Sequence, residues 1–168
     1  NLVPDAKTVG VLYNSSEDNS VLQAQIAKEA VEAKGLVYTE VTVSNTNEVQ
    51  QATQAIVNQC DAIYIPTDNI FASAMPVVHG VTSQSKTPVI CGESGMVMSG
   101  GLATLGINYY ELGYQTGLMA IRIFEEGAHP STMPIEAAKE FDFTINGKVA
   151  EEIGLEIPED LLEYVVYE

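Results

Sequence analysis

The chain has 168 residues, which is enough for one hydrophobic core and is about the size of one ordinary domain. It carries 23 acidic and 7 basic residues, for a formal net charge of −16, and Arg122 is its single arginine. A nucleic-acid-binding protein needs cations to displace the counterions of phosphate, so this composition argues against nucleic acid and anionic membrane surfaces as partners. No apolar run approaches the roughly 20 residues that a membrane-spanning helix needs.

Residues 1–108 alternate apolar segments with amphipathic ones. The apolar segments predict five strands, at residues 8–13, 36–43, 62–65, 88–91 and 102–105. Asp18, Asn19 and Ser20 offer N-caps for the first intervening helix, which is expected to run through Lys34 with Leu22, Ile26 and Ala30 on one face. Strands that are apolar on both faces and separated by helices indicate an α/β fold. We therefore expect a doubly wound, mainly parallel five-stranded sheet with helices on both faces.

The pattern changes at Tyr109, where a long helix is predicted to run to about Glu126. It carries Gly113, Gly117 and Ala120, a stripe of small residues that lets a neighbour approach closely. A strand at residues 141–145 and a short helix near residue 146 follow. We divide the chain into a ligand-binding lobe (1–108), a crossover helix and segment (109–140), and a return strand with a C-terminal helix and tail (141–168).

The two cysteines, Cys60 and Cys91, are expected to be free, buried thiols. Cys60 ends a predicted helix just before a strand, whereas Cys91 lies near the carboxyl end of the next strand. In a parallel sheet these positions are at opposite ends, so a disulfide is not expected. Their spacing offers no metal site either.

Polar residues gather in four loops that each follow a predicted strand, at residues 14–20, 66–69, 92–95 and 106–110. Ligands of open α/β sheets bind beyond the carboxyl ends of the strands, so these loops are expected to meet at one edge. Helix N-termini and hydroxyls there suit an anionic group. Glu17, Asp68 and Glu93 could accept hydrogen bonds from an ammonium or from hydroxyls. Tyr13, Tyr109 and Tyr110 could add an apolar wall with a polar tip. Helix capping explains any one of the polar residues equally well.

Signatures of catalysis are missing from the sequence. No glycine-rich dinucleotide or phosphate-binding loop follows the first strand, and in residues 92–96 the second glycine comes one residue early for a nucleophile elbow. His79 and His129 lie outside the strand-end loops, so a serine there would have no base. No segment has the spacing of a calcium loop, and we expect no metal or cofactor. A carboxylate-based hydrolase using Glu17 and Glu93 is the remaining enzymatic alternative.

Four segments, at residues 2–20, 61–69, 106–113 and 145–158, together resemble the ABC-transporter substrate-binding protein family that includes tryptophan- and tyrosine-binding lipoproteins. They occur in the family's order across nearly the whole chain. The resemblance implies a type I periplasmic-binding-protein fold, in which two α/β lobes close on a ligand. Family members are nearly twice as long as this chain, and its first residue aligns with their middle.

The resemblance also implies a role and a set of contacts. The role is to hold a small molecule, an aromatic or other amino acid, for an ABC permease at the extracellular face of the membrane or in the periplasm, with a lipid anchor on the missing N-terminal part. The implied ligand-binding residues are Asn14, Ser15, Glu17, Asn19, Ser20, Thr67, Asp68, Asn69, Glu93 and Asn108.

Residues 109–140 are expected to pack on the missing first lobe. In isolation the helix would expose an apolar face or pair with a second copy, for example by domain swapping. The alternative function is a ligand-sensing domain of a signalling or transcription regulator on the same fold. The segment before residue 1 in the full gene would distinguish the two, since it would hold either a lipoprotein signal or DNA-binding helices.

Overall fold

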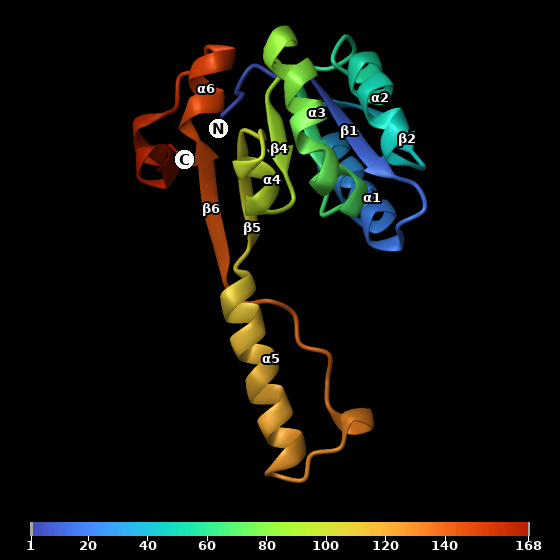
Figure 1. Ribbon diagram of the computed structural model, residues 1–168, viewed down its shortest axis with the longest axis vertical. Coiled ribbons are helices and arrows are strands. Elements are labelled where there is room, and N and C mark those ends of the chain that lie inside the picture. The colour runs from blue at the N-terminus through green and yellow to red at the C-terminus, as the bar shows by residue number, and fades with distance from the viewer. Residues whose placement is uncertain (1, 168) are drawn as a thin grey trace.

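The computed structural model describes residues 2–167 as a mixed α/β fold (Figure 1). The strands are β1 (Thr8–Asn14), β2 (Val37–Val43), β3 (Ala62–Ile65), β4 (Val89–Cys91), β5 (Ala103–Ile107), β6 (Phe141–Asn146) and β7 (Val165–Val166). The α-helices are α1 (Asp18–Ala33), α2 (Val49–Ile56), α3 (Asn69–Ser85), α4 (Ser94–Met98), α5 (Tyr109–Phe124) and α6 (Gly147–Ile153).

The strands form a seven-stranded sheet in the order β2-β1-β3-β4-β5-β6-β7 within the described residues. The five predicted strands are present, and neighbouring ones pair in parallel, with Val9 opposite Tyr38 of β2 and Ala62 of β3. The sheet has seven strands among the described residues, two more than the five predicted for it. The return strand β6 joins the sheet antiparallel to β5, and the two-residue β7 extends it in parallel. A segment as short as β7 has no periodicity that a sequence could display.

Helices cover the two faces of the sheet unequally (Figure 1). The helices α2, α3 and α4 lie on one face, where α3 also contacts α6. The fully buried side chains of Ile63, Ile65, Phe71 and Met75 form the centre of the core beneath them. Helix α1 lies on the opposite face. The reason is that the crossover from β1 to β2 runs across the sheet in the direction opposite to the crossovers from β2 to β3, β4 and β5. The predicted doubly wound architecture is therefore confirmed.

Helix α1 ends near the predicted residue, but Glu17, and not Asp18, Asn19 or Ser20, is its N-cap residue, and the predicted apolar face does not pack on the sheet. Leu22 and Ile26 are exposed, whereas Ser20, Ala24 and Val31 are buried against the sheet. Short side chains at Ser20 and Ala24 let the helix backbone approach the sheet closely. The long apolar side chains are consequently left on the outer and lateral sides of the helix.

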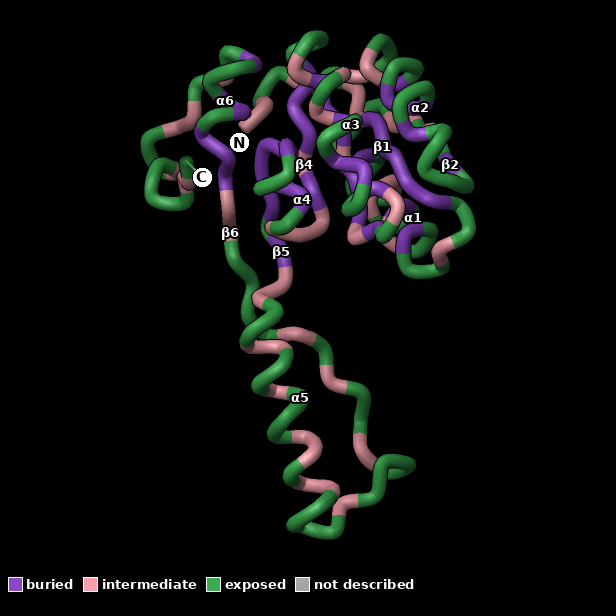
Figure 2. Tube along the Cα trace, in the orientation of Figure 1, coloured by how far each residue is buried: buried purple, intermediate pink, exposed green. Residues whose placement is uncertain are grey.

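Helix α5 extends away from the sheet, and residues 125–140 return alongside it (Figure 1). Figure 2 shows that this whole extension is exposed or half-buried, and no residue of α5 is buried. Glu136 of the return segment accepts hydrogen bonds from Gln115 and Arg122 and so ties the segment to one side of the helix. Among the described residues, no helix is both long enough and apolar enough to cross a membrane.

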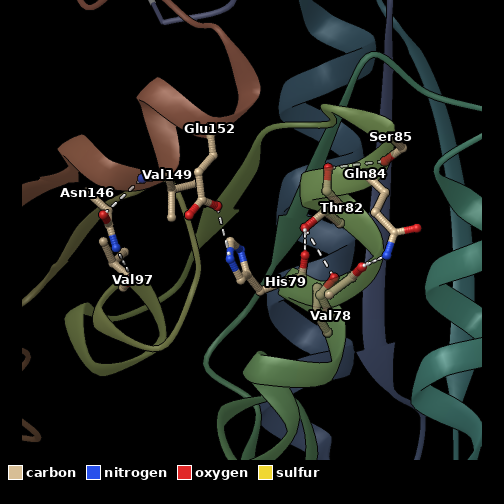
Figure 3. Close-up of polar contacts among 10 residues, drawn as sticks. Val78, His79, Thr82, Gln84, Ser85, Val97, Asn146, Val149 and Glu152 are labelled. Carbon is tan, nitrogen blue, oxygen red and sulfur yellow. Dashed lines mark hydrogen bonds and ion pairs between the residues drawn. The ribbon is translucent and has the colours of Figure 1, made fainter.

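The C-terminal segment rejoins the lobe through polar contacts that Figure 3 shows in detail. Asn146 caps α6 by accepting from the Val149 N–H at 3.1 Å, and its Nδ2 donates to the Val97 carbonyl at 3.0 Å. On the other side of α6, Glu152 Oε2 lies 3.2 Å from His79 Nε2 of α3. These contacts fix β6 and α6 to the lobe, so residues 141–167 belong to the same body as residues 2–108.

Both cysteines are free thiols, as predicted. Cys91 is buried, whereas Cys60 is only partly buried. Burial raises the pKa of the Cys60 thiol to about 11, and burial likewise raises the pKa of Cys91. Both thiols therefore stay protonated, and unreactive as nucleophiles, near neutral pH.

Candidate ligand-binding site

The polar loops are numbered here by the strands they follow, so residues 14–20 form the first loop, 66–69 the third, 92–95 the fourth and 106–110 the fifth. Asp68 joins the first and third loops at the carboxyl edge of the sheet. Its Oδ2 accepts the backbone N–H of Asn14, the last residue of β1, at 2.7 Å. Its Oδ1 accepts the N–H of Phe71 at 3.1 Å and so caps α3. Asp68 is 2% exposed and Asn14 is 5% exposed. Both residues therefore lie inside the site, where they hold the two loops together.

Glu17 makes a second link between the same loops. Its Oε1 accepts from Asn14 Nδ2 at 2.9 Å, and its Oε2 accepts from the N–H and Nδ2 of Asn69 at 3.1 and 2.8 Å. Partial burial raises the pKa of the Glu17 carboxyl, but the hydrogen bonds from Asn14 and Asn69 outweigh this effect, so the pKa lies below its usual value. The carboxylate is therefore ionised and occupied by donors of its own chain.

The backbone of Thr67 is held by the first turns of α1. Its carbonyl accepts from Asn19 Nδ2 at 2.8 Å and from the buried Ser20 Oγ at 3.4 Å. Its N–H donates to Gln23 Oε1 at 3.1 Å. Gln23 is not among the binding residues predicted from the sequence. Its position one helical turn after Asn19 is the signal that could have identified it.

The fourth and fifth loops use their predicted residues as helix caps. Glu93 accepts from the N–H groups of Gly95 and Met96, both at 2.7 Å, at the start of α4. Asn108 Oδ1 accepts from the Glu111 N–H at 2.9 Å at the start of α5. The fourth loop reaches the third through the Thr67 hydroxyl, which lies 3.5 Å from the Gly92 carbonyl oxygen. Hydrogen bonds thus connect the first, third and fourth loops.

The groups that remain open to solvent at this edge are hydroxyls, amides and the start of α1. Ser15 is exposed, and its hydroxyl makes only a long hydrogen bond of 3.4 Å to Val43. The N-cap residue Glu17 makes no capping hydrogen bond to the first turn of α1, so side chains leave the amides of that turn unoccupied. Tyr109 and Tyr110 are 51% and 79% exposed. Tyr13, by contrast, is buried beneath α1, and its hydroxyl faces Glu40.

This set of groups can bind a polar ligand with an anionic part. N–H groups at a helix start and a serine hydroxyl are donors that suit a carboxylate. Within residues 2–167, no group of three or more histidine, cysteine, aspartate or glutamate side chains is arranged to hold a metal ion. The chain leaves the sheet for α5 at this same edge and returns to it at residue 140. There the Asn108 N–H donates a hydrogen bond to the Glu140 carbonyl at 3.1 Å.

The Glu17 network predicts a pH-dependent contribution to stability. Because the pKa of Glu17 is lowered in the folded state, its stabilising effect is present above the usual pKa of 4.5 and is lost as the pH falls through the lower folded value. We expect Glu17→Gln to lower the free energy of unfolding by about 1 kcal/mol at pH 7, because an amide donor would face the Asn69 N–H, and by less at pH 3. Urea denaturation at both pH values measures this difference.

Glu156→Gln provides the control, because Glu156 is exposed on the distant C-terminal segment. We expect this variant to match the wild type at both pH values. A Glu17→Gln effect that is equal at pH 7 and pH 3 would contradict the assigned role of the ionised carboxylate.

The chain belongs to the ABC transporter substrate binding protein family, whose family model matches residues 1–166. A tyrosine-binding protein of Clostridioides difficile (strain R20291) is 35% identical to it over 165 residues, which are 98% of this chain and 48% of that protein. The chain therefore spans about half the length of the curated relatives it matches. The family model and the tyrosine-binding relative describe substrate-binding proteins and not enzymes.

Solved structures agree with this assignment. The crystal structure of an ABC domain in complex with L-Trp, from Streptococcus pneumonia, is 37% identical with a TM-score of 0.89, covering 98% of this chain and 57% of that one. The ligand-free, open structure of a substrate-binding protein with adhesive properties from Clostridium difficile is 40% identical with a TM-score of 0.79, covering 99% and 56%. The fold is therefore that of a periplasmic binding protein.

Proposed function

We propose that this chain is one lobe of a solute-binding protein that holds an aromatic amino acid in a cleft between two lobes. The observation that carries the proposal is that all four polar loops lie at the edge where the chain leaves for α5 and returns. A second lobe placed there would face Ser15, Asn19, Asn69 and the start of α1. The carboxylate of an amino acid would be bound by the α1 amides and Ser15.

The remaining predicted residues have supporting roles in this proposal. Asn14, Glu17, Ser20 and Asp68 hydrogen-bond within and between the loops and so fix the positions of the contact groups. Thr67, Glu93 and Asn108 give the third, fourth and fifth loops their shape. A site supported in this way is rigid before the ligand arrives, which reduces the ordering cost of binding.

The comparisons support the choice of ligand class and partner. One relative is named for binding tyrosine, and one similar structure contains L-Trp. In this proposal residues 109–140 pack against the second lobe, and the bound amino acid is passed to an ABC permease. The protein would act outside the cytoplasmic membrane as a lipoprotein, and the strong negative charge would help to keep it soluble there.

A thermal-shift titration of the whole two-lobed protein with L-tryptophan, L-tyrosine, L-lysine and glucose tests the proposal. The aromatic amino acids are expected to raise the melting temperature, because a ligand at 100 times its Kd stabilises the native state by about 2.7 kcal/mol. The 168-residue lobe alone is expected to show no shift, because half a cleft leaves one face of the ligand in water. No response of the whole protein to either aromatic amino acid would refute the proposed ligand class.

A matched pair of serine variants locates the site. Ser15→Ala removes an exposed hydroxyl at the carboxyl edge and is expected to weaken binding about fivefold, equivalent to about 1 kcal/mol, with unchanged stability. Ser83→Ala lies near the end of α3, away from that edge, and is expected to leave affinity unchanged. Equal affinities for both variants would remove Ser15 from the binding site.

A further inference from the structure

Thr104 carries a buried hydroxyl that has no hydrogen-bond partner. The residue lies within β5 and is 0% exposed, and its Oγ1 makes no hydrogen bond. Nearly all buried hydroxyls are hydrogen-bonded, because burying one without a partner costs free energy. Among residues 2–167, the other buried side-chain atom of this kind is His79 Nδ1, which lies on α3. Since Thr104 is fully enclosed by its own lobe, a partner for its hydroxyl has to come from the same lobe.

The Thr104 hydroxyl lies beneath the fourth loop. Side chains alternate along a strand, so residues 104 and 106 lie on the same face of β5. A Cβ added at Gly106 would lie 3.0 Å from Thr104 Oγ1 and 3.5 Å from the carbonyl oxygen of Gly92. Because Gly106 has no side chain, the loop backbone and the hydroxyl border the same small space. The Gly92 carbonyl is therefore the acceptor that a small shift of the fourth loop would bring to Thr104.

The Gly92 carbonyl already has a donor, but that donor is held weakly. Thr67 Oγ1 lies 3.5 Å from it, beyond the roughly 2.5–3.0 Å of an ordinary hydrogen bond between a hydroxyl and an oxygen. The backbone of Thr67 is fixed by Asn19 and Gln23, so the hydroxyl is the part of this residue that is able to turn to a new acceptor. Thr67 is half-buried at the carboxyl edge, where a ligand would offer such an acceptor.

We propose that Thr104 is a positioning residue whose hydroxyl holds the fourth loop in the ligand-bound state, an inference that rests on the proposed binding of an amino acid. When a carboxylate oxygen of the ligand accepts the Thr67 O–H, the Gly92 carbonyl loses its donor. The fourth loop then settles toward β5, and the Thr104 O–H donates to the Gly92 carbonyl. The exchange leaves neither hydroxyl unpaired, and Thr104 never touches the ligand.

This exchange gives the Thr104 hydroxyl opposite effects on stability and on affinity. Without ligand the hydroxyl is buried and unpaired, and it therefore destabilises the lobe. With ligand bound it is paired, so the penalty disappears on binding and adds to the affinity. A residue that costs stability and supports function in this way is expected at a binding site. A residue with a purely structural role would instead stabilise the protein in both states.

Two variants of Thr104 in the whole two-lobed protein test the proposal. Thr104→Val keeps the shape and removes the hydroxyl. We expect it to raise the melting temperature without ligand by about 2 °C and to raise the Kd for L-tryptophan or L-tyrosine about fivefold, measured by calorimetry. Thr104→Ser keeps the hydroxyl and removes a buried methyl group. We expect it to lower the melting temperature and to keep the affinity of the wild type.

A buried threonine with a satisfied hydroxyl provides the control. Thr53 of α2 is also 0% exposed, but its Oγ1 donates to the Val49 carbonyl at 2.7 Å. Thr53→Val is therefore expected to lower the melting temperature and to leave the affinity unchanged. Thr67→Val tests the exchange itself, because it frees the Gly92 carbonyl before any ligand arrives. In a Thr67→Val background, Thr104→Val should no longer weaken binding.

Three results would overturn the proposal. The first is wild-type affinity in Thr104→Val. The second is an equal loss of affinity in Thr104→Val and Thr104→Ser, which would assign the residue to packing alone. The third is a Thr104→Val protein that melts below the wild type, which would show that the hydroxyl is already paired without ligand. In each case the wild-type protein still binds the amino acid, so these failures differ from a failure of the proposed function, in which the wild type binds neither L-tryptophan nor L-tyrosine.

Discussion

Replacing Asp68 with alanine is expected to lower the free energy of unfolding by about 2–4 kcal/mol. The carboxylate is 2% exposed and accepts two backbone N–H groups, from Asn14 at 2.7 Å and from Phe71 at 3.1 Å. Alanine removes both acceptors and leaves two buried donors without partners, at a cost of roughly 1–3 kcal/mol for each such group. The loss of the α3 cap is part of the same effect. Urea denaturation monitored by circular dichroism measures the difference.

Two variants show whether the cause is the lost acceptors. Asp68→Asn keeps one carbonyl oxygen and presents a donor to the other N–H, so about half of the loss is expected. Asp18→Ala removes an exposed carboxylate in the first turn of α1 and is expected to cost at most about 0.5 kcal/mol. An Asp68→Ala protein within 0.5 kcal/mol of the wild type would show that the loops are held together by other contacts.

The mainly parallel sheet and the meeting of the loops could be predicted from the sequence because both follow from local patterns. Short apolar segments separated by helices specify a parallel sheet, and parallel strands bring their carboxyl ends to one edge. Helix capping was also expected as an alternative role of the polar loop residues, and Asp68 and Asn108 do cap α3 and α5. The antiparallel β6 was predicted as a strand, but its place beside β5 depends on pairs of residues that are 34 to 42 positions apart in the sequence, from Ile107–Phe141 to Ala103–Ile145.

The sequence could not show which polar loop residues are buried and hold the loops together and which are exposed to a ligand. Asp68 and Ser15 are both polar loop residues, yet one is buried with two donors and the other is exposed. The difference arises from loop geometry in three dimensions. The same limit applies to α1, where periodicity located Leu22 and Ile26 on one side but gave no information on which side faces the sheet.

Replacing Gly92 with alanine is expected to disturb both stability and ligand binding. Gly92 follows β4 at the point where the fourth loop crosses the third, and a Cβ there would lie 2.7 Å from the Pro66 carbonyl carbon and 2.8 Å from Thr67 Oγ1. Because the obstacle includes backbone, it cannot be relieved by a side-chain rotation. Overpacking of this kind costs about 1–3 kcal/mol, and the third loop must shift to accommodate it.

The shift of the third loop would reach the proposed contact residues. Thr67 is bonded to Asn19 and Ser20 of α1, so its displacement changes the position of the helix start. In the whole two-lobed protein we expect Gly92→Ala to weaken binding of L-tryptophan or L-tyrosine at least tenfold by calorimetry, since misplaced donors lose about 1.4 kcal/mol or more. Gly80→Ala is the control, because an added Cβ there meets no atom within 4 Å and alanine favours the interior of α3. Wild-type stability and affinity for Gly92→Ala would show that the third and fourth loops can separate without consequence for the site.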